Sequence, residues 1–96
     1  MQFIVLFRRV SERFADADFV PHLAAERQRA RELYADGFIR QIWSRGDTGG
    51  ACLLVEADGE DAVRSTLATL PLVAAGMLEV SSLVPLKPYA GFGPQP

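Results

Sequence analysis

The residue best placed for chemistry is a carboxylate within an otherwise apolar helical stripe. Between residues 19 and 33 the stripe recurs at steps of four and three residues, and Glu26 occupies one of its positions. A carboxylate facing a core loses hydration, which raises its pKa and suits it to abstract a proton from carbon near neutral pH. Alternatively, the helix is slightly rotated, and Glu26 is solvated and pairs with Arg27 or Arg29. The spacing leaves both interpretations open.

Other side chains could assist a carboxylate at position 26. His22 lies four residues earlier on the same helical face, where it could orient a proton-transfer group or simply be solvated. Arg40 and Trp43 fall on opposite faces of a predicted strand, and regular alternation puts Ile39, Gln41 and Arg45 on the face of Trp43. An inward Arg40 would hold an acidic ligand by paired hydrogen bonds, although surface arginine is the commoner case. Trp43 could contact a ligand or pack against a neighbouring element.

Composition argues against several classes of function. A single histidine and a single cysteine, Cys52, cannot build a cluster of soft ligands, so we expect no transition-metal site. A net charge of −2, with arginines scattered among acids, argues against a nucleic-acid partner. No apolar run is long enough to span a membrane, and a lone cysteine fits a reducing compartment. We therefore expect a cytoplasmic protein.

The elements that must position these residues follow in a simple order. Strands are predicted over residues 3–7, 38–45, 51–57 and 77–84, with the middle two joined by a hairpin at Gly46–Gly50. One helix of about five turns is predicted from Phe19 to Gly37, after caps at Asp16 and Asp18, with Pro21 in its first turn. A second follows Asp58 and ends at Pro71. The order predicts an α+β fold, ferredoxin-like βαββαβ, with both helices on one face of a four-stranded antiparallel sheet.

This architecture has consequences for assembly. We expect one domain over residues 1–86 and an extended tail over 87–96 that forms no regular structure. The first, third and fourth strands are apolar on both faces, so the sheet face without helices should be covered by a second copy in a homodimer or an oligomer of dimers. Tyr89 and Phe92 are aromatic anchors that could dock on the partner subunit and close a ligand site, or belong to a frayed terminus.

Several short strings resemble the muconolactone isomerase family of small dimeric α+β barrel proteins. They are Ala25-Glu26-Arg27, Asp36-Gly37-Phe38, Arg40-Gln41-Ile42-Trp43, Leu70-Pro71-Leu72 and Val84-Pro85-Leu86. The resemblance implies a cofactor-independent 1,3-proton shift on a small carboxylated lactone in aromatic compound catabolism. It also implies that Glu26 moves the proton and that Arg40, or less specifically Arg27, binds the substrate carboxylate. The Gly46–Gly50 hairpin and the Gly-Phe-Gly tail differ from the authentic isomerases and indicate a relative of them.

Three hypotheses about function follow. The first is a proton-transfer isomerase that acts on a small carboxylated ring compound and uses Glu26. The second is a non-catalytic dimer that binds or presents a small ligand. The third is a cofactor-free oxygenase of the α+β barrel type, which rests on analogy of fold alone. A buried, titrating Glu26 favours the first, whereas a solvated Glu26 beside an acid-free pocket favours the second.

Overall fold

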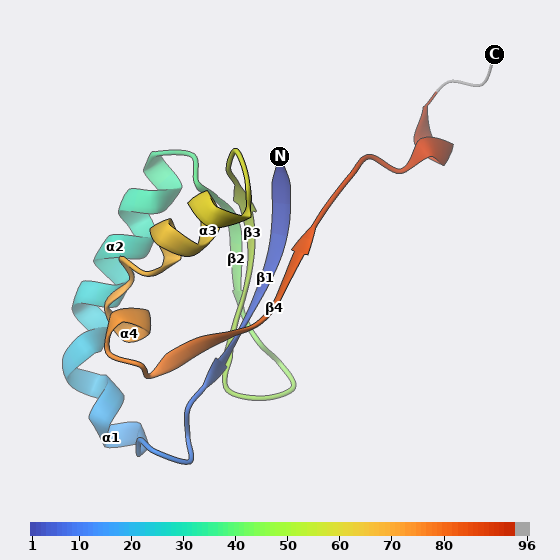
Figure 1. The fold of residues 1–96 in the computed structure, drawn as a ribbon. Coiled ribbons are helices and arrows are strands. Elements are labelled where there is room, and N and C mark those ends of the chain that lie inside the picture. The colour runs from blue at the N-terminus through green and yellow to red at the C-terminus, as the bar shows by residue number, and fades with distance from the viewer. Residues whose placement is uncertain (94–96) are drawn as a thin grey trace.

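The described residues form a sheet with helices on one side. The computed structural model describes residues 1–93, and Figure 1 shows four strands backed by the helices. The strands are β1 (Gln2–Arg9), β2 (Ile39–Ser44), β3 (Gly50–Glu56) and β4 (Leu78–Pro85). They pair antiparallel in the order β2-β3-β1-β4. The predicted ferredoxin-like α+β fold is therefore confirmed.

The first helical segment follows one continuous path but consists of three helical elements of different type. It comprises α1 (Asp16–Phe19), a 3-10 turn η1 (Val20–His22) and α2 (Leu23–Ala35), where one α-helix was predicted. Pro21 lies in the 3-10 turn and has no backbone N–H to donate to the hydrogen bonds of a continuous α-helix. The second helical segment also divides, into α3 (Glu60–Leu67) and α4 (Pro71–Ala74). The second helix was predicted to end at Pro71, but α3 ends at Leu67, and Pro71 instead begins α4.

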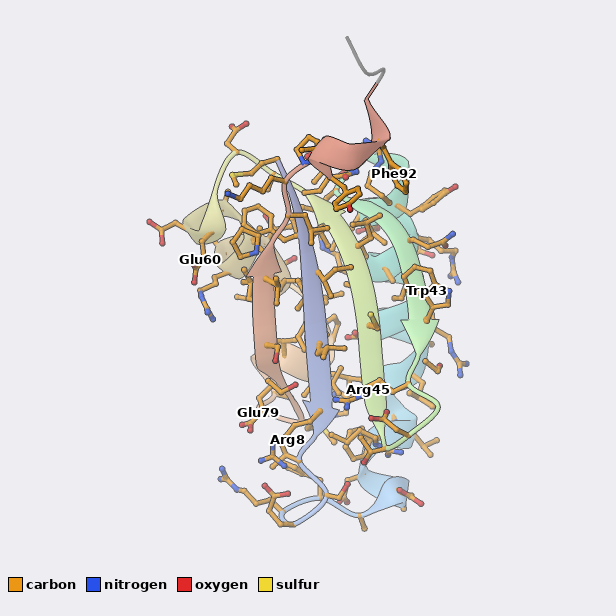
Figure 2. All side chains as sticks on the ribbon, turned by 90° about the vertical axis from the view of Figure 1, so that its right-hand side faces the viewer. Arg8, Trp43, Arg45, Glu60, Glu79 and Phe92 are labelled. Carbon is orange, nitrogen blue, oxygen red and sulfur yellow. The ribbon has the colours of Figure 1, made fainter. Side chains whose placement is uncertain are left out.

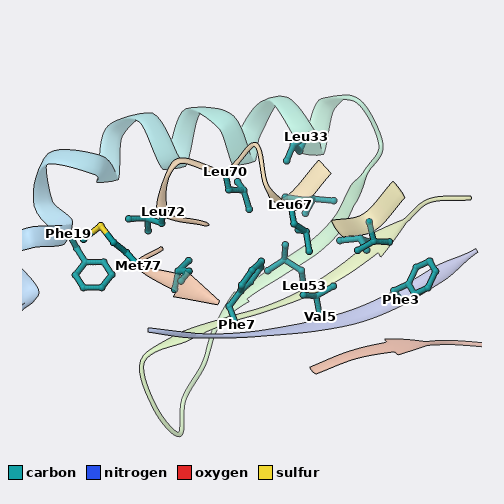
Figure 3. Packing of buried hydrophobic residues seen from close by; sticks show 14 residues of the cluster. Phe3, Val5, Phe7, Phe19, Leu33, Leu53, Leu67, Leu70, Leu72 and Met77 are labelled. Atoms are coloured by element: carbon teal, nitrogen blue, oxygen red, sulfur yellow. The ribbon is translucent and has the colours of Figure 1, made fainter. Parts of the chain in front are cut away.

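The core lies between the sheet and the helices. Phe3, Val5 and Phe7 of β1 are almost completely buried, and they face the helices from the centre of the sheet. The cluster is completed by residues from every packed element: Phe19, Leu33, Ile39, Leu53, Val55, Val63, Leu67, Leu70, Leu72, Met77 and Leu78 (Figure 3). Since burying each large apolar side chain contributes about 1.5–3 kcal/mol, this layer fixes how the helices sit on the sheet.

The other face of the sheet carries apolar side chains that no described element covers. Ile4 and Leu6 of β1 are half-buried beside Leu54 and Cys52 of β3, with which they pair in register. At the rim of this face Trp43 is 49% exposed (Figure 2). We call this surface the open face.

A bulge in β2 changes which residues share a face. Pairing with β3 shifts between Ile39 and Gln41, which oppose Val55 and Leu54, so Arg40 is an extra, exposed residue. Regular alternation had predicted Ile39, Gln41 and Trp43 on one face. That prediction was wrong, because the bulge leaves Ile39 in the core while the next two lie on the open face.

The segment after β4 leaves the domain as an arm. Residues 87–93 extend beyond the sheet, with a short 3-10 turn η2 at Ala90–Phe92 (Figure 1). The prediction of no regular structure was therefore wrong at this turn, and residues 94–96 lie outside the described part of the chain. The rings of Tyr89 and Phe92 stack edge to face at 5.2 Å, yet these residues are 72% and 90% exposed.

Candidate active site

Glu26 lies in the first turn of α2 and points toward α4. Its Oε1 accepts a hydrogen bond of 2.9 Å from the backbone N–H of Leu72, 46 residues later in the chain. Leu72 follows Pro71 at the start of α4, where backbone N–H groups have no partner within the helix. The carboxylate therefore caps α4 and is held in place by it.

The surroundings of Glu26 change its acidity. The side chain is half-buried, and the loss of hydration raises the pKa of Glu26. The hydrogen bond from Leu72 and the charge of His22 oppose this rise, because both favour the ionised form. Desolvation is the largest of these effects, so Glu26 holds a proton more readily than an ordinary surface carboxylate.

A cavity of about 550 Å³ lies beside this carboxylate, at the end of the sheet where the β2–β3 hairpin approaches α1 and α2. Its volume suits a small organic molecule. Most of its wall is apolar, and Glu26 shares it with other charged side chains. The lining residues are Arg9, Asp16, Phe19, Leu23, Glu26, Ser44, Arg45, Gly49, Gly50, Ala51, Leu72 and Leu78.

Arg45 follows β2 and reaches the cavity from the hairpin. Its side chain is only 18% exposed, and its Nη1 lies 3.4 Å from the carbonyl oxygen of Phe7. Nε and Nη2 donate to the two carboxylate oxygens of Asp47 at 3.0 and 2.8 Å. Strand alternation places Arg45 on the same face as Trp43, and the register beyond the bulge agrees, because Ser44 pairs with Ala51 and the Arg45 N–H donates to the Gly50 carbonyl oxygen. Arg45 therefore borders the cavity while its guanidinium lies on the open face, the face that Figure 2 shows.

Arg9, at the end of β1, brings a positive charge to the cavity wall. Its guanidinium carbon lies 3.8 Å from the centre of the Phe19 ring, and its Nη2 lies 3.3 Å from Asp16 Oδ1. The acidic partner is almost fully exposed, so it screens this charge only weakly. The aromatic contact holds the arginine against the cavity.

Two consecutive glycines make this arrangement possible. A Cβ at Gly49 would lie 2.8 Å from Cδ of Arg9. A Cβ at Gly50 would lie 2.0 Å from the carbonyl oxygen of Phe7 and 3.2 Å from Cδ of Arg45, and Gly50 has φ +141°. A larger residue at either position would displace an arginine or the backbone of β1. The hairpin glycines thus leave room for both arginine side chains beside β1.

The structure brings some predicted site residues together and separates others. Glu26 lines the cavity, and His22 is half-buried one turn before it and acts on it through charge. Arg27 and Arg40 are exposed and lie outside the cavity wall. Trp43 lies on the open face. The tail that carries Tyr89 and Phe92 projects from the end of the molecule opposite to the cavity (Figures 1 and 2).

Sequence reasoning missed Arg9 and Arg45 as site residues. A signal was present, since two adjacent glycines at the start of a strand indicate that other groups approach the backbone closely.

Residues 1–93 contain no group of three or more His, Cys, Asp or Glu side chains that could hold a metal ion. Within the same residues, no helix has the length and apolar character needed to cross a membrane.

Fold and site together define a class of protein. It is a small ferredoxin-like α+β domain whose cavity, between the helices and one end of the sheet, combines a half-buried carboxylate with an arginine.

The family model for muconolactone delta-isomerase matches residues 1–89, and the chain belongs to this family. A similar solved structure is that of 5-chloro-2-hydroxyhydroquinone dehydrochlorinase (TftG) from Burkholderia phenoliruptrix AC1100, in complex with 2,5-dihydroxybenzoquinone. The TM-score is 0.63 at 20% sequence identity, over 88% of this chain and 89% of that chain, which supports the fold. A comparison with curated proteins found no significant match. The resemblance inferred from the sequence is therefore confirmed at the level of the family.

Proposed function

We propose that this protein is a cofactor-independent enzyme that moves a proton within a small, carboxylated ring compound. The observation that supports this most directly is the half-buried Glu26 at an apolar cavity, with a raised pKa. The ionised form would take a proton from one carbon of an unsaturated lactone and return it two atoms away. Electrons shift through the conjugated system, so the reaction needs no oxidant or reductant. Membership of the muconolactone delta-isomerase family supports the same chemistry.

An arginine at the cavity would handle negative charge. Arg9, whose guanidinium lies over the Phe19 ring at the cavity wall, would contact the ligand carboxylate and stabilise the enolate that develops when the proton leaves. In this proposal Arg9 takes the part that the sequence assigned to Arg40 and Arg27. His22 would remain a positioning residue whose charge favours the ionised state of Glu26.

The open face points to assembly. We propose that two copies pair through this face, which would bury Ile4, Leu6, Leu54 and the exposed Trp43. Because the tail projects away from its own cavity, Tyr89 and Phe92 could contact a ligand site only on another copy. Deleting residues 88–96 should then change the oligomeric state or the ligand affinity, and this part of the proposal fails if both are unchanged.

Turnover of muconolactone by wild type and by Glu26→Gln tests the catalytic proposal. Glutamine keeps an acceptor for Leu72 but cannot take a proton, so the rate should fall by a factor of about 10² to 10⁴. Glu32→Gln is a matched control, because it removes the same charge from an exposed position on the same helix. Equal rates for wild type and Glu26→Gln, or no turnover by wild type, would reject the proposal.

One observation favours a non-catalytic alternative. The hydrogen bond from Leu72 gives Glu26 a structural role as the cap of α4, which would place a carboxylate here without any chemistry. In that case the protein would bind a small ligand and leave it unchanged. The two functions separate in one experiment, since a binding protein would show saturable ligand binding that is the same for wild type and Glu26→Gln, with no product formed.

A further inference from the structure

The side chain of Arg9 is held on the helix side of the sheet by the β2–β3 hairpin. Alternation along β1 places it on the same face as the buried Phe7, whereas its neighbour Arg8 pairs with Glu79 on the open face (Figure 2). The stem of Arg9 lies against Gly49, because a Cβ there would come 2.8 Å from the arginine Cδ. The backbone N–H of Arg9 also donates to the Gly49 carbonyl oxygen at 3.2 Å. Backbone and stem are therefore both fixed.

The Phe19 ring holds the charged end of the same side chain. The guanidinium carbon of Arg9 lies 3.8 Å from the ring centre, well inside the range of about 6 Å over which a ring face attracts a cation. Phe19 is 3% exposed and belongs to the core cluster (Figure 3). It also packs edge to face on Phe14, with 6.4 Å between the ring centres. The ring is therefore a rigid support for the guanidinium at the cavity wall.

This support leaves the positive charge of Arg9 available. An aromatic ring attracts a guanidinium without neutralising it, whereas a carboxylate neutralises it. Arg8 shows the second case, since it pairs with both Glu12 and Glu79. The acidic contact of Arg9 is a single one, 3.3 Å from Nη2 to Oδ1 of Asp16, whose side chain is 99% exposed. Such a pair is weak, so an acid group in the cavity can still bind the guanidinium.

We propose that Phe19 is a positioning residue, which holds the Arg9 guanidinium in place for the acid group of a ligand in the cavity. A free arginine loses rotamer freedom when it binds an anion, and the ring removes that freedom in advance. The benefit applies to ligands that carry a carboxylate or a similar oxyanion, and neutral ligands of the same shape do not share it. The inference rests on the proposed function in one respect, namely that the ligand is acidic.

Affinities for an anionic probe and a neutral probe test this directly. Benzenesulfonate has an apolar ring and stays ionised over the whole working range of pH, and benzenesulfonamide is a neutral match of similar shape. Phe19→Leu keeps an apolar core residue but removes the ring. Its preference for benzenesulfonate over benzenesulfonamide, measured by calorimetry, should fall about three- to tenfold below that of wild type. Arg9→Gln should abolish the preference, and adding Phe19→Leu to Arg9→Gln should change it no further.

Two variants serve as matched controls. Phe3→Leu removes the same ring from an equally buried site at the opposite end of the core (Figure 3). Arg31→Gln removes the same charge from an exposed position on α2. Both should keep the wild-type preference for the anion. An equal fall in Phe3→Leu, an unchanged preference in Phe19→Leu, or a wild type without any preference would each overturn the inference.

A measurement on the wild type keeps the test independent of how well Phe19→Leu folds. A proton above an aromatic ring is shifted upfield, so the Nε–H proton of Arg9 should resonate upfield of that of the exposed Arg31. Arg9→Gln assigns the signal, and the shift should persist when benzenesulfonate binds. A shift that is absent, or that is lost on binding, would overturn the inference. Anion affinity does not depend on proton transfer by Glu26, so this test and the turnover test can fail separately.

Discussion

Removing the carboxylate at position 26 separates its structural role from its chemical role. Glu26→Ala takes away the acceptor of the Leu72 N–H, 2.9 Å from Oε1, and leaves that donor unpaired where α4 begins. An unpaired, partly buried donor costs about 1–3 kcal/mol, whereas Glu26→Gln retains an oxygen at the same place. We therefore expect Glu26→Ala to be less stable than Glu26→Gln by about 1–2 kcal/mol. Both variants should lose turnover to the same extent.

Thermal unfolding followed by circular dichroism measures this difference. For a domain of this size, 1 kcal/mol corresponds to a change in Tm of about 4–8 °C, which is easily resolved. Protein concentration must be held equal, because pairing of two copies would add a concentration-dependent term. Equal Tm values for the two variants would refute the assigned hydrogen bond. Full activity in either variant would refute the assigned chemistry.

Three further predictions follow from the structure. Burial raises the pKa of Glu26 in the folded state, so protonation of Glu26 stabilises the folded state. This stabilisation is complete at a pH below the pKa of Glu26 in the unfolded chain, and it is lost as the pH rises through the pKa of Glu26 in the folded protein. The unfolding free energy of wild type minus that of Glu26→Gln, from urea titrations, should therefore fall as the pH rises above the ordinary range of a carboxylate pKa, and a constant difference would contradict the shift. Gly50→Ala should destabilise the protein by more than about 1 kcal/mol, since its Cβ would meet the Phe7 carbonyl oxygen, whereas Gly46→Ala has open space and should be near neutral in the same melts. Trp43→Asp should shift sedimentation velocity toward a monomer if the open face pairs two copies, and an unchanged profile would remove that residue from the interface.

Much of the fold could be read from local patterns. The apolar run that became β1, the hairpin glycines between β2 and β3, and the helical stripe of α2 each depend on neighbours a few residues away. Their order restricts the topology strongly, because βαβ connections are right-handed. Glu26 was also found this way, since a charged residue in an apolar stripe is visible in the sequence alone.

Other features depend on register, which local patterns do not encode. The bulge at Arg40 cannot be inferred from alternation, and it moved Ile39 into the core while Gln41 and Trp43 went to the open face. The break at Pro21 and the separate helix that begins at Pro71 likewise depend on how the segments pack on the sheet. Boundary residues are therefore the least predictable part of each element.

The sequence by itself determined the element order, the apolar segments and one unusual carboxylate, since these follow from residue type and short periodicity. Tertiary structure decided which groups surround that carboxylate. Leu72 lies 46 residues from Glu26, and Arg9 and Arg45 come from the ends of different strands. They meet only because antiparallel pairing brings the end of β1 beside the hairpin, where Gly49 and Gly50 leave room for both arginines. Which distant residues meet depends on sheet register and on packing in three dimensions, and the amino-acid sequence gives only a weak signal of it.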